Sequence, residues 1–153
     1  MESLGLLHLY YGDGKGKTTA AMGLALRALG SGKRVVIVQF LKGGQSGEIP
    51  LLEQLGATVY RGKAGQKFVF QMNEAEKAAT RTLQNQNLAA ALAQPCDLLV
   101  LDEACAALKS NILDEALLRK AAAFAKDGRE VVVTGRDPAP WLQDAADYST
   151  EMQ

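Results

Sequence analysis

The chain has 153 residues, a length that suits one domain, residues 1–153, with a substantial hydrophobic core. Its 17 lysine and arginine residues balance 17 acidic residues, which argues against a dedicated nucleic-acid binder and against a polybasic membrane-surface protein. One histidine and two cysteines are too few for a Cys/His zinc site or a disulfide scaffold. No apolar stretch approaches the roughly 20 residues that span a bilayer, and the first residues lack a signal-peptide pattern, so we expect a cytoplasmic protein.

Apolar runs alternate with helical patterns in the first half of the chain. A short apolar run, Leu4–Tyr10, leads into a glycine-rich loop, and Gly16–Leu29 then carries its apolar residues on one helical stripe. Val35–Leu41 predicts a strand that is apolar on both faces, as buried parallel strands are. Pro50–Gly56 predicts a short helix that proline opens and glycine closes, and Thr58–Arg61 predicts another short strand.

The second half continues this alternation. We expect an exposed loop over Gly62–Lys67, followed by a long helix towards Leu92 whose start is marked by the capping-box pair Asn73 and Glu76. The remaining elements are predicted in the order strand, helix, strand and edge strand, over Leu98–Leu101, Leu113–Lys126, Glu130–Thr134 and Asp147–Met152. Such alternation is typical of a parallel α/β sheet with right-handed crossovers.

The loop before the first helix carries the strongest chemical signal in the sequence. It reads Tyr11-Gly12-Asp13-Gly14-Lys15-Gly16-Lys17-Thr18-Thr19. Glycine allows tight turns that point backbone N–H groups at phosphate oxygens, and the start of a helix adds unpaired N–H groups and a positive dipole end. In such a loop Lys17 reaches the phosphates and the Thr18 hydroxyl ligates Mg²⁺. Lys15 supplies a second cation, suited to a triphosphate.

This loop departs by one residue from the usual pattern G-x-x-x-x-G-K-[ST]. Counted back from Gly16, the first glycine of the pattern falls on Tyr11. A glycine-rich turn that only caps the helix is the alternative, but the strand before the loop and the helix after it favour phosphate binding. We therefore predict a three-layer α/β fold of the P-loop NTPase type with a mostly parallel central sheet.

A second signal lies at the end of the predicted strand Leu98–Leu101, where Asp102 and Glu103 follow. In such folds a carboxylate at this point lies beside the phosphate loop and holds Mg²⁺ directly or through water. The alternative is that Asp102 caps the next segment and that Glu103 is solvated. We predict a metal site formed by Thr18, Asp102 and Glu103, and the spacing leaves open whether Glu103 is a metal ligand or a base.

Four motifs occur in a fixed order, namely Gly12–Thr19, Val38–Gly43, Val100–Glu103 and Thr134–Arg136. With this set, the sequence resembles the P-loop type of ATP:corrinoid adenosyltransferase from about residue 5 to residue 151. The family's loop is one residue short in the same way and usually reads G-N-G-K-G-K-T-T, so Asp13 replaces an asparagine. Members typically carry an extra N-terminal segment that helps to cover the active site, whereas here the loop begins at Gly12.

The resemblance implies an enzyme that binds MgATP and transfers its 5′-deoxyadenosyl group to Co(I) of a reduced corrinoid, releasing triphosphate. The loop backbone, Lys15 and Lys17 then stabilise the leaving triphosphate. Thr18 and Glu103 look like the Mg²⁺ ligands, with Asp102 in support. The nucleophile belongs to the corrinoid, so no general base is needed. The family also implies a homodimer and an electron-donating flavoprotein or reductase as partners.

The same resemblance assigns five further residues. Arg27 matches a family arginine that contacts the nucleotide, and Lys42 and Arg136 follow strands at the carboxyl edge, where they face phosphate or the corrinoid. Phe68 and Phe70 match an aromatic pair that helps to displace the lower axial base of the corrinoid, with Phe70 in place of the usual tryptophan. The alternatives are solvated cations and phenylalanines that fill an edge of the core.

Two other functions remain open on the sequence alone. An ordinary P-loop ATPase or small-molecule kinase would move the γ-phosphoryl group and release ADP, and a nucleotide-binding module would bind MgATP without turnover. The motif Gln39-Phe40-Leu41-Lys42-Gly43 favours the adenosyltransferase, because a generic ATPase does not require it.

Overall fold

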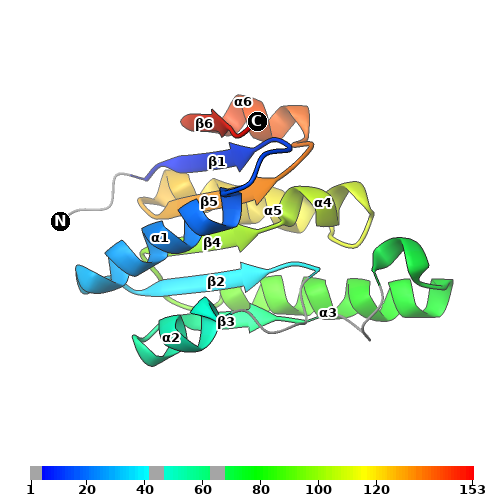
Figure 1. The fold of residues 1–153 in the computed structure, drawn as a ribbon, viewed down its shortest axis with the longest axis horizontal. Coiled ribbons are helices and arrows are strands. Elements are labelled where there is room, and N and C mark those ends of the chain that lie inside the picture. Colours follow the sequence, from blue (N-terminus) through cyan, green and yellow to red (C-terminus); the bar gives the residue numbers. More distant parts are fainter. Residues whose placement is uncertain (1–4, 42–46, 63–67) are drawn as a thin grey trace.

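Six parallel strands form one central sheet in the computed structural model, which describes residues 5–41, 47–62 and 68–153 (Figure 1). In chain order the strands are β1 (Leu7–Tyr11), β2 (Val35–Gln39), β3 (Thr58–Arg61), β4 (Leu98–Asp102), β5 (Glu130–Gly135) and β6 (Tyr148–Glu151). Across the sheet their order is β3-β2-β4-β5-β1-β6, so β1 lies between β5 and β6. The predicted α/β fold is confirmed, and the sheet is parallel throughout.

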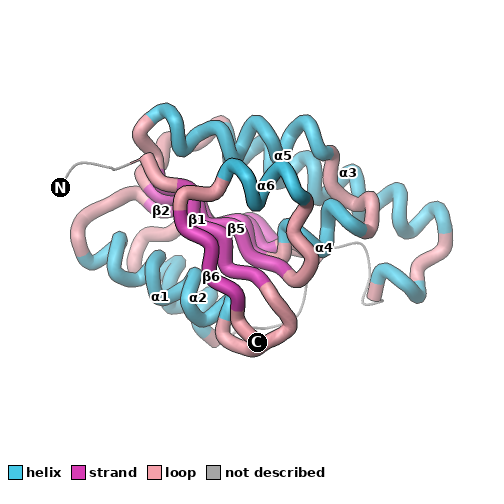
Figure 2. The backbone as a smooth tube through the Cα atoms, turned by 90° about the horizontal axis from the view of Figure 1, so that it is seen from above, coloured by secondary structure: helices cyan, strands magenta, loops and turns pink. Residues whose placement is uncertain are grey.

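Helices cover both faces of the sheet and complete the three layers (Figure 2). One face carries α1 (Lys17–Gly30) and α2 (Glu48–Gln54). The other face carries α3 (Glu74–Leu92), α4 (Ala104–Lys109), α5 (Glu115–Ala122) and α6 (Pro140–Ala145). Two 3₁₀ helices, η1 (Val69–Gln71) and η2 (Ala123–Asp127), precede α3 and extend α5. None of the helices in the described part of the chain has the length and apolar character needed to span a bilayer.

Side-chain alternation along the strands divides the core into two clusters. On β2, Val35 and Ile37 pack against the α1 layer, whereas Val36 belongs to the cluster under the α3 layer. Gln39, at the end of β2, lies on the same face as Val35 and Ile37. Its partner in register on β4, Asp102, also lies on this face. Both polar residues therefore lie at the end of the face that α1 covers.

The helix starts follow from local hydrogen bonding. At the start of α3, Asn73 Oδ1 accepts the Glu76 N–H at 2.8 Å and Glu76 Oε1 accepts the Asn73 N–H at 3.2 Å, which confirms the predicted capping box. Helix α2 begins at Glu48 rather than at Pro50. A proline in the first turn removes only an N–H that has no partner inside the helix.

Other segments differ from the prediction. The helix expected over Leu113–Lys126 is divided into α5 and η2, and Asp114 is the N-cap of α5. Helices α4 and α6 are not predicted by the sequence, because six residues are too few to establish an apolar period. The loop expected over Gly62–Lys67 lies, beyond Gly62, outside the described residues. The predicted edge strand is confirmed as β6.

Candidate active site

The phosphate loop, residues 12–16, leaves the sheet at the edge where all six strands end (Figure 1). Backbone hydrogen bonds hold it from both sides: the Gly12 N–H donates to the Gly135 oxygen at 3.2 Å, and the Gly14 N–H donates to the Met152 oxygen at 2.6 Å. Gly12 has a φ of 114°, and a Cβ at this position would overlap the Met152 carbonyl oxygen. The loop therefore requires glycine here.

The start of α1 is arranged to receive an anion. Gly16 occupies the N-cap with a φ of 108°, and no side chain caps the helix. The first turn of α1 contains no acidic residue. The N-cap residue therefore supplies no side chain to the first N–H groups of α1, and no acidic residue of the first turn meets the positive end of the helix dipole. A phosphate group is the ligand that such a helix start binds.

Lys17 lies folded back over the loop. Its Nζ donates to the carbonyl oxygen of Gly14 at 2.7 Å, and the residue is only 8% exposed. A buried ammonium group needs hydrogen-bond acceptors or a negative charge beside it. A phosphate on the loop would give it both. Lys15, Asp13 and Thr19 are exposed around the same loop.

Asp102 is fully buried at the end of β4, where side chains of the described residues Thr18, Thr134 and Gln39 donate hydrogen bonds to it. Thr18 Oγ1 donates to Asp102 Oδ1 at 2.9 Å, Thr134 Oγ1 donates to the same oxygen at 2.8 Å, and Gln39 Nε2 donates to Oδ2 at 3.2 Å. Hydrogen bonds to a charged group contribute about 1.5–3 kcal/mol each, so the carboxylate is firmly held against Thr18. Asp102 is not the cap of the next helix, because the N-cap of α4 is Glu103.

Glu103 turns the chain sharply after β4. Its φ of 64° lies in the left-handed region, which costs a residue with a side chain about 1–3 kcal/mol and is common at functional sites. The Glu103 N–H donates to Thr134 Oγ1 at 2.9 Å. This hydrogen bond helps to hold the strained turn directly beside the Asp102 carboxylate.

The side chains at this edge suit a magnesium ion that arrives with a nucleotide. In the described ranges, no three His, Cys, Asp or Glu side chains form a metal cluster of their own. Nucleotide-bound Mg²⁺ needs fewer protein ligands, because phosphate oxygens and water complete its shell. Thr18, Asp102 and Glu103 offer one hydroxyl and two carboxylates. The nearby Gln39 Oε1 is a buried acceptor with no hydrogen-bond partner among the described residues, so the local polarity also fits an ion.

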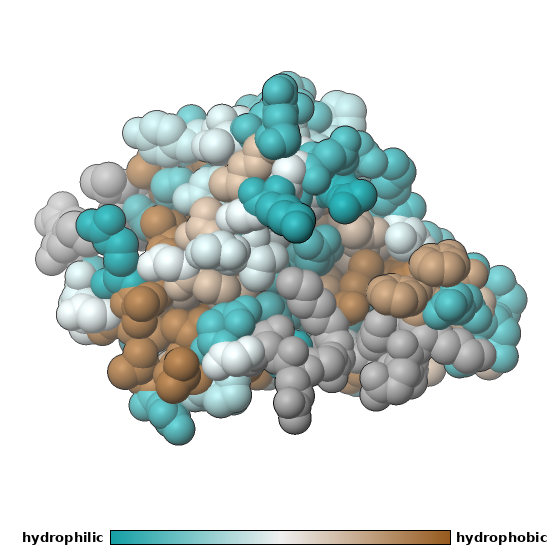
Figure 3. Space-filling model, in the orientation of Figure 1, coloured by the Kyte–Doolittle hydropathy of each residue, from teal (hydrophilic) through white to brown (hydrophobic). Residues whose placement is uncertain are grey.

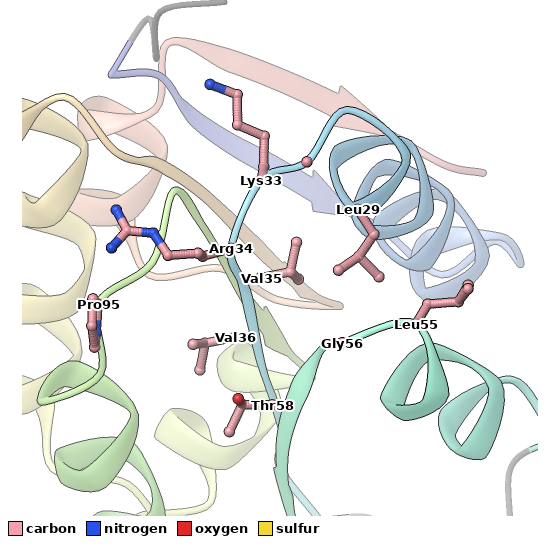
Figure 4. Close-up of a pocket in the computed structure, with 10 residues that line it drawn as sticks. Leu29, Lys33, Arg34, Val35, Val36, Leu55, Gly56, Thr58 and Pro95 are labelled. Atoms are coloured by element: carbon pink, nitrogen blue, oxygen red, sulfur yellow. The ribbon is translucent and has the colours of Figure 1, made fainter.

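A hollow of about 350 Å³ lies at the opposite edge of the sheet (Figure 4). Its cationic side chains are Lys33 and Arg34, and Figure 4 shows that they point in different directions. Arg34 is paired with Asp97 at 3.3 Å. Ligands of parallel α/β sheets bind beyond the carboxyl ends of the strands. The phosphate-loop edge is therefore the candidate active site.

Comparison with known proteins distinguishes among families that bind nucleotides in this way. Residues 3–153 match the family model described as ATP:corrinoid adenosyltransferase BtuR/CobO/CobP. The chain belongs to the ATP:corrinoid adenosyltransferase family. The corrinoid adenosyltransferase CobA of Salmonella typhimurium is 37% identical, over 99% of this chain and 78% of the relative. Corrinoid adenosyltransferases of Pseudomonas aeruginosa and Escherichia coli K12 are 34% and 32% identical, over 97% of this chain and 74% and 76% of the relatives. The resemblance drawn from the four motifs is thus confirmed.

The aromatic pair expected for an adenosyltransferase lies before α3. Phe68 and Phe70 are 63% and 82% exposed, and their rings stack with centroids 5.6 Å apart and planes inclined by 5°. The two rings do not fill an edge of the core, so that alternative is wrong. Figure 3 shows apolar surface around the segment that leads into α3, and a second apolar area over α2, where Leu51 and Leu55 are exposed.

The family resemblance assigns three cationic residues outside the phosphate loop, Arg27, Lys42 and Arg136, and the two that the structure describes do not lie together. Arg136 follows β5 and is exposed at the phosphate-loop edge. Arg27 is exposed in the last turn of α1. At 1.5 Å per residue it lies about 15 Å from Lys17 along the helix axis, so α1 does not bring it to the loop. Lys42 lies outside the described residues.

The adenosyltransferase site contains two residues, Gln39 and Thr134, to which the sequence motifs assigned no individual role. Strand alternation is the signal that could have found them. Gln39, Asp102 and Thr134 each continue, at the carboxyl end of a strand, the series of apolar residues that faces α1. Three polar side chains that lie on the α1 face of adjacent strands, each at the carboxyl end of its strand, predict a buried polar cluster beside the start of α1.

Proposed function

We propose that the chain transfers the 5′-deoxyadenosyl group of MgATP to Co(I) of a reduced corrinoid and releases inorganic triphosphate. A Co–C bond forms, the bond between C5′ and its oxygen breaks, and the electron pair leaves with the triphosphate. The observation that carries the proposal is the uncapped, non-acidic start of α1 behind a glycine loop in a member of this family.

The phosphate-loop residues would bind and stabilise the leaving group. Backbone N–H groups at the start of α1 and the Lys17 ammonium meet the charge that develops on the triphosphate, and Lys15 adds a second cation at the loop. Thr18, Asp102 and Glu103 would hold Mg²⁺, which supplies further positive charge against the triphosphate when bound. Interactions that strengthen as charge develops favour the transition state over the bound substrate.

The corrinoid would approach across the exposed aromatic pair. Phe68 and Phe70 present stacked rings at the carboxyl edge, and flat apolar surface suits a flat macrocycle. Arg136 and Lys42 are the further cations that we assign to the two substrates. The assignment of Arg27 to the nucleotide rests on the family resemblance, because α1 does not bring this residue to the phosphate loop. Within this arrangement the protein positions the reactants, and the reactive metal centre belongs to the substrate.

The proposal includes partners and a compartment. An electron-donating flavoprotein or reductase would supply the reduced corrinoid, and the active form would be a homodimer. Cys96 and Cys105 are free and buried, as suits a reducing compartment, and we place the reaction in the cytoplasm.

One experiment tests the reaction directly. The protein is incubated with MgATP and a chemically reduced corrinoid under anoxic conditions in the dark, and the products are separated by chromatography. We expect a light-sensitive Co–C product together with triphosphate. Release of ADP and phosphate would instead establish an ordinary ATPase or kinase. Binding of MgATP without any product would establish a nucleotide-binding module.

A further inference from the structure

Three buried polar residues lie side by side across neighbouring strands at the carboxyl edge of the sheet. Gln39 of β2 pairs in register with Asp102 of β4. The pairing of β4 with β5 continues from Leu101 and Val133 towards Asp102 and Thr134. The exposed fractions of Gln39, Asp102 and Thr134 are 1%, 0% and 0%. This row interrupts the apolar α1 face of the sheet at the point where Thr18 meets Asp102.

The Thr134 hydroxyl joins two parts of the site. It donates to Asp102 Oδ1 at 2.8 Å and accepts the Glu103 N–H at 2.9 Å. A hydroxyl has a single proton, so donation to Asp102 leaves its oxygen lone pairs for Glu103. One side chain therefore links the Asp102 carboxylate to the left-handed turn at Glu103.

Gln39 holds the other oxygen of the same carboxylate. Because Asp102 Oδ2 accepts, the amide nitrogen of Gln39 faces it, and the amide oxygen is turned elsewhere. That Oε1 atom is buried and has no hydrogen-bond partner in the described ranges. An apolar side chain of similar size would pack without leaving an unpaired oxygen. Packing alone therefore does not account for a glutamine at this position, whereas its hydrogen bond to Asp102 does.

We infer that Gln39 and Thr134 are positioning residues, which hold Asp102 and the turn at Glu103 in the geometry that the Mg²⁺–nucleotide complex requires. They act through these two carboxylate residues and through Thr18, which shares Asp102 Oδ1 with Thr134. The inference rests on the proposed MgATP site and adds to it the two residues that fix its metal-facing side.

The test measures ATP affinity by titration calorimetry, once with Mg²⁺ and once with EDTA. Thr134→Val removes the hydrogen bonds of the hydroxyl to Asp102 and to the Glu103 N–H, and Gln39→Leu removes the hydrogen bond to Asp102 Oδ2. We expect each to weaken ATP affinity about tenfold in Mg²⁺, which equals about 1.4 kcal/mol, and to leave the affinity in EDTA nearly unchanged. Thr134→Ser keeps the hydroxyl and is expected to restore affinity in Mg²⁺.

Matched controls are available on α3. Thr80 and Gln84 are 0% and 1% exposed, and Gln84 also has a buried amide oxygen without a hydrogen-bond partner among the described residues. Thr80→Val and Gln84→Leu therefore make the same chemical changes in another layer of the molecule. We expect them to leave the effect of Mg²⁺ on ATP affinity unchanged. Circular dichroism checks that each variant is folded, and either active-site variant is sufficient if the other does not fold.

Three outcomes would overturn the inference. They are an equal loss of affinity in Mg²⁺ and in EDTA, an equal loss in the α3 controls, and unchanged affinity in the folded active-site variants. Absence of Mg²⁺-dependent ATP binding in the unmodified chain would instead contradict the proposed function. Failure of the inference is seen in the variants, whereas failure of the proposed function is seen in the unmodified chain, so the two can be told apart.

Discussion

Cys105 and Gly135 are in close contact behind the active site. The Gly135 backbone lies so near to Cys105 that a Cβ at position 135 would overlap the cysteine side chain. Cys105 is 2% exposed, on the helix that follows Glu103. Burial, with a smaller effect of the Glu103 carboxylate, raises the pKa of the Cys105 thiol to about 12. This thiol is therefore a packing group rather than a reactive one.

We predict that Cys105 does not react with iodoacetamide in the folded protein. A pKa of about 12 leaves the thiol protonated at pH 8, and only the thiolate is a good nucleophile. Burial also raises the pKa of Cys96, so both cysteines are expected to stay unlabelled in buffer and to be labelled in urea. Mass spectrometry of the intact protein and of its peptides gives the result. Rapid labelling of Cys105 without urea would contradict the packing against Gly135.

At the scale of elements, one ion pair connects the start of β2 to the start of β4. The Arg34 N–H donates to Asp97 Oδ2 at 2.8 Å, and the Arg34 guanidinium contacts both carboxylate oxygens at 3.3 Å. The Asp97 N–H returns a hydrogen bond to the Arg34 oxygen at 2.8 Å. These contacts immediately precede the paired residues Val35 and Leu98, so they help to set the register in which Gln39 meets Asp102.

We predict that Asp97→Asn lowers thermal stability slightly, by about 1–2 °C in Tm, because solvent screens this ion pair. Hydrogen bonds from Arg34 hold the pKa of the Asp97 carboxyl below its usual value. The stabilising effect is therefore complete above that usual value and is lost as the pH falls through the lowered pKa. Unfolding of both proteins between pH 2 and pH 7 should give curves that converge at the acid end. The exposed Asp144→Asn is the control, and a difference that grows towards low pH would contradict the assignment.

The elements that depend on local pattern could be predicted from the sequence, whereas the short ones could not. Strand β3 and the capping box of α3 are found where the sequence indicates, because β-branched residues and an Asn73–Glu76 pair act locally. Helices α4 and α6 depend on packing against the sheet, which six residues do not reveal. The sequence predicts the start of α2 at Pro50, two residues after the observed start at Glu48, because the first turn of a helix tolerates proline at more than one position.

The candidate site divides in the same way. The phosphate loop and the Asp102–Glu103 pair could be predicted because their spacing along the chain is itself the signal. The hydrogen bonds of Thr134 and Gln39 to Asp102 depend on the order β2-β4-β5, which joins residues far apart in the chain. The left-handed backbone of Glu103 likewise arises from the way in which β4 meets α4.

Over the whole molecule, the phosphate loop is the point where distant parts of the chain meet. The loop donates to the Gly135 oxygen at the end of β5 and to the Met152 oxygen just after β6, and the Thr18 hydroxyl donates to Asp102 at the end of β4. A ligand on this loop therefore contacts a region that three strands support. Its binding energy adds to the stability of the whole described fold, because ligands that bind only the folded state shift the unfolding equilibrium.

We predict that MgATP raises the Tm of the protein. At 100 times its Kd a ligand adds about 2.7 kcal/mol, which corresponds to a rise of roughly 5–10 °C for a chain of this size. Lys17→Ala removes the ammonium that lies over the loop, so we expect most of this rise to disappear at the same MgATP concentration, together with product formation. The Tm without ligand should change little, since the hydrogen bond to the Gly14 oxygen is the one that the Lys17 ammonium makes within the described residues.

Lys120→Ala on α5 serves as the matched control, because this exposed lysine belongs to the layer on the other face of the sheet from α1. Differential scanning fluorimetry over a series of MgATP concentrations separates the intrinsic Tm from the effect of the ligand. An undiminished rise in the Lys17→Ala variant would mean that the nucleotide binds away from the phosphate loop. An equal reduction in both variants would point to general electrostatic attraction between the protein and ATP, because then any loss of a lysine would weaken binding.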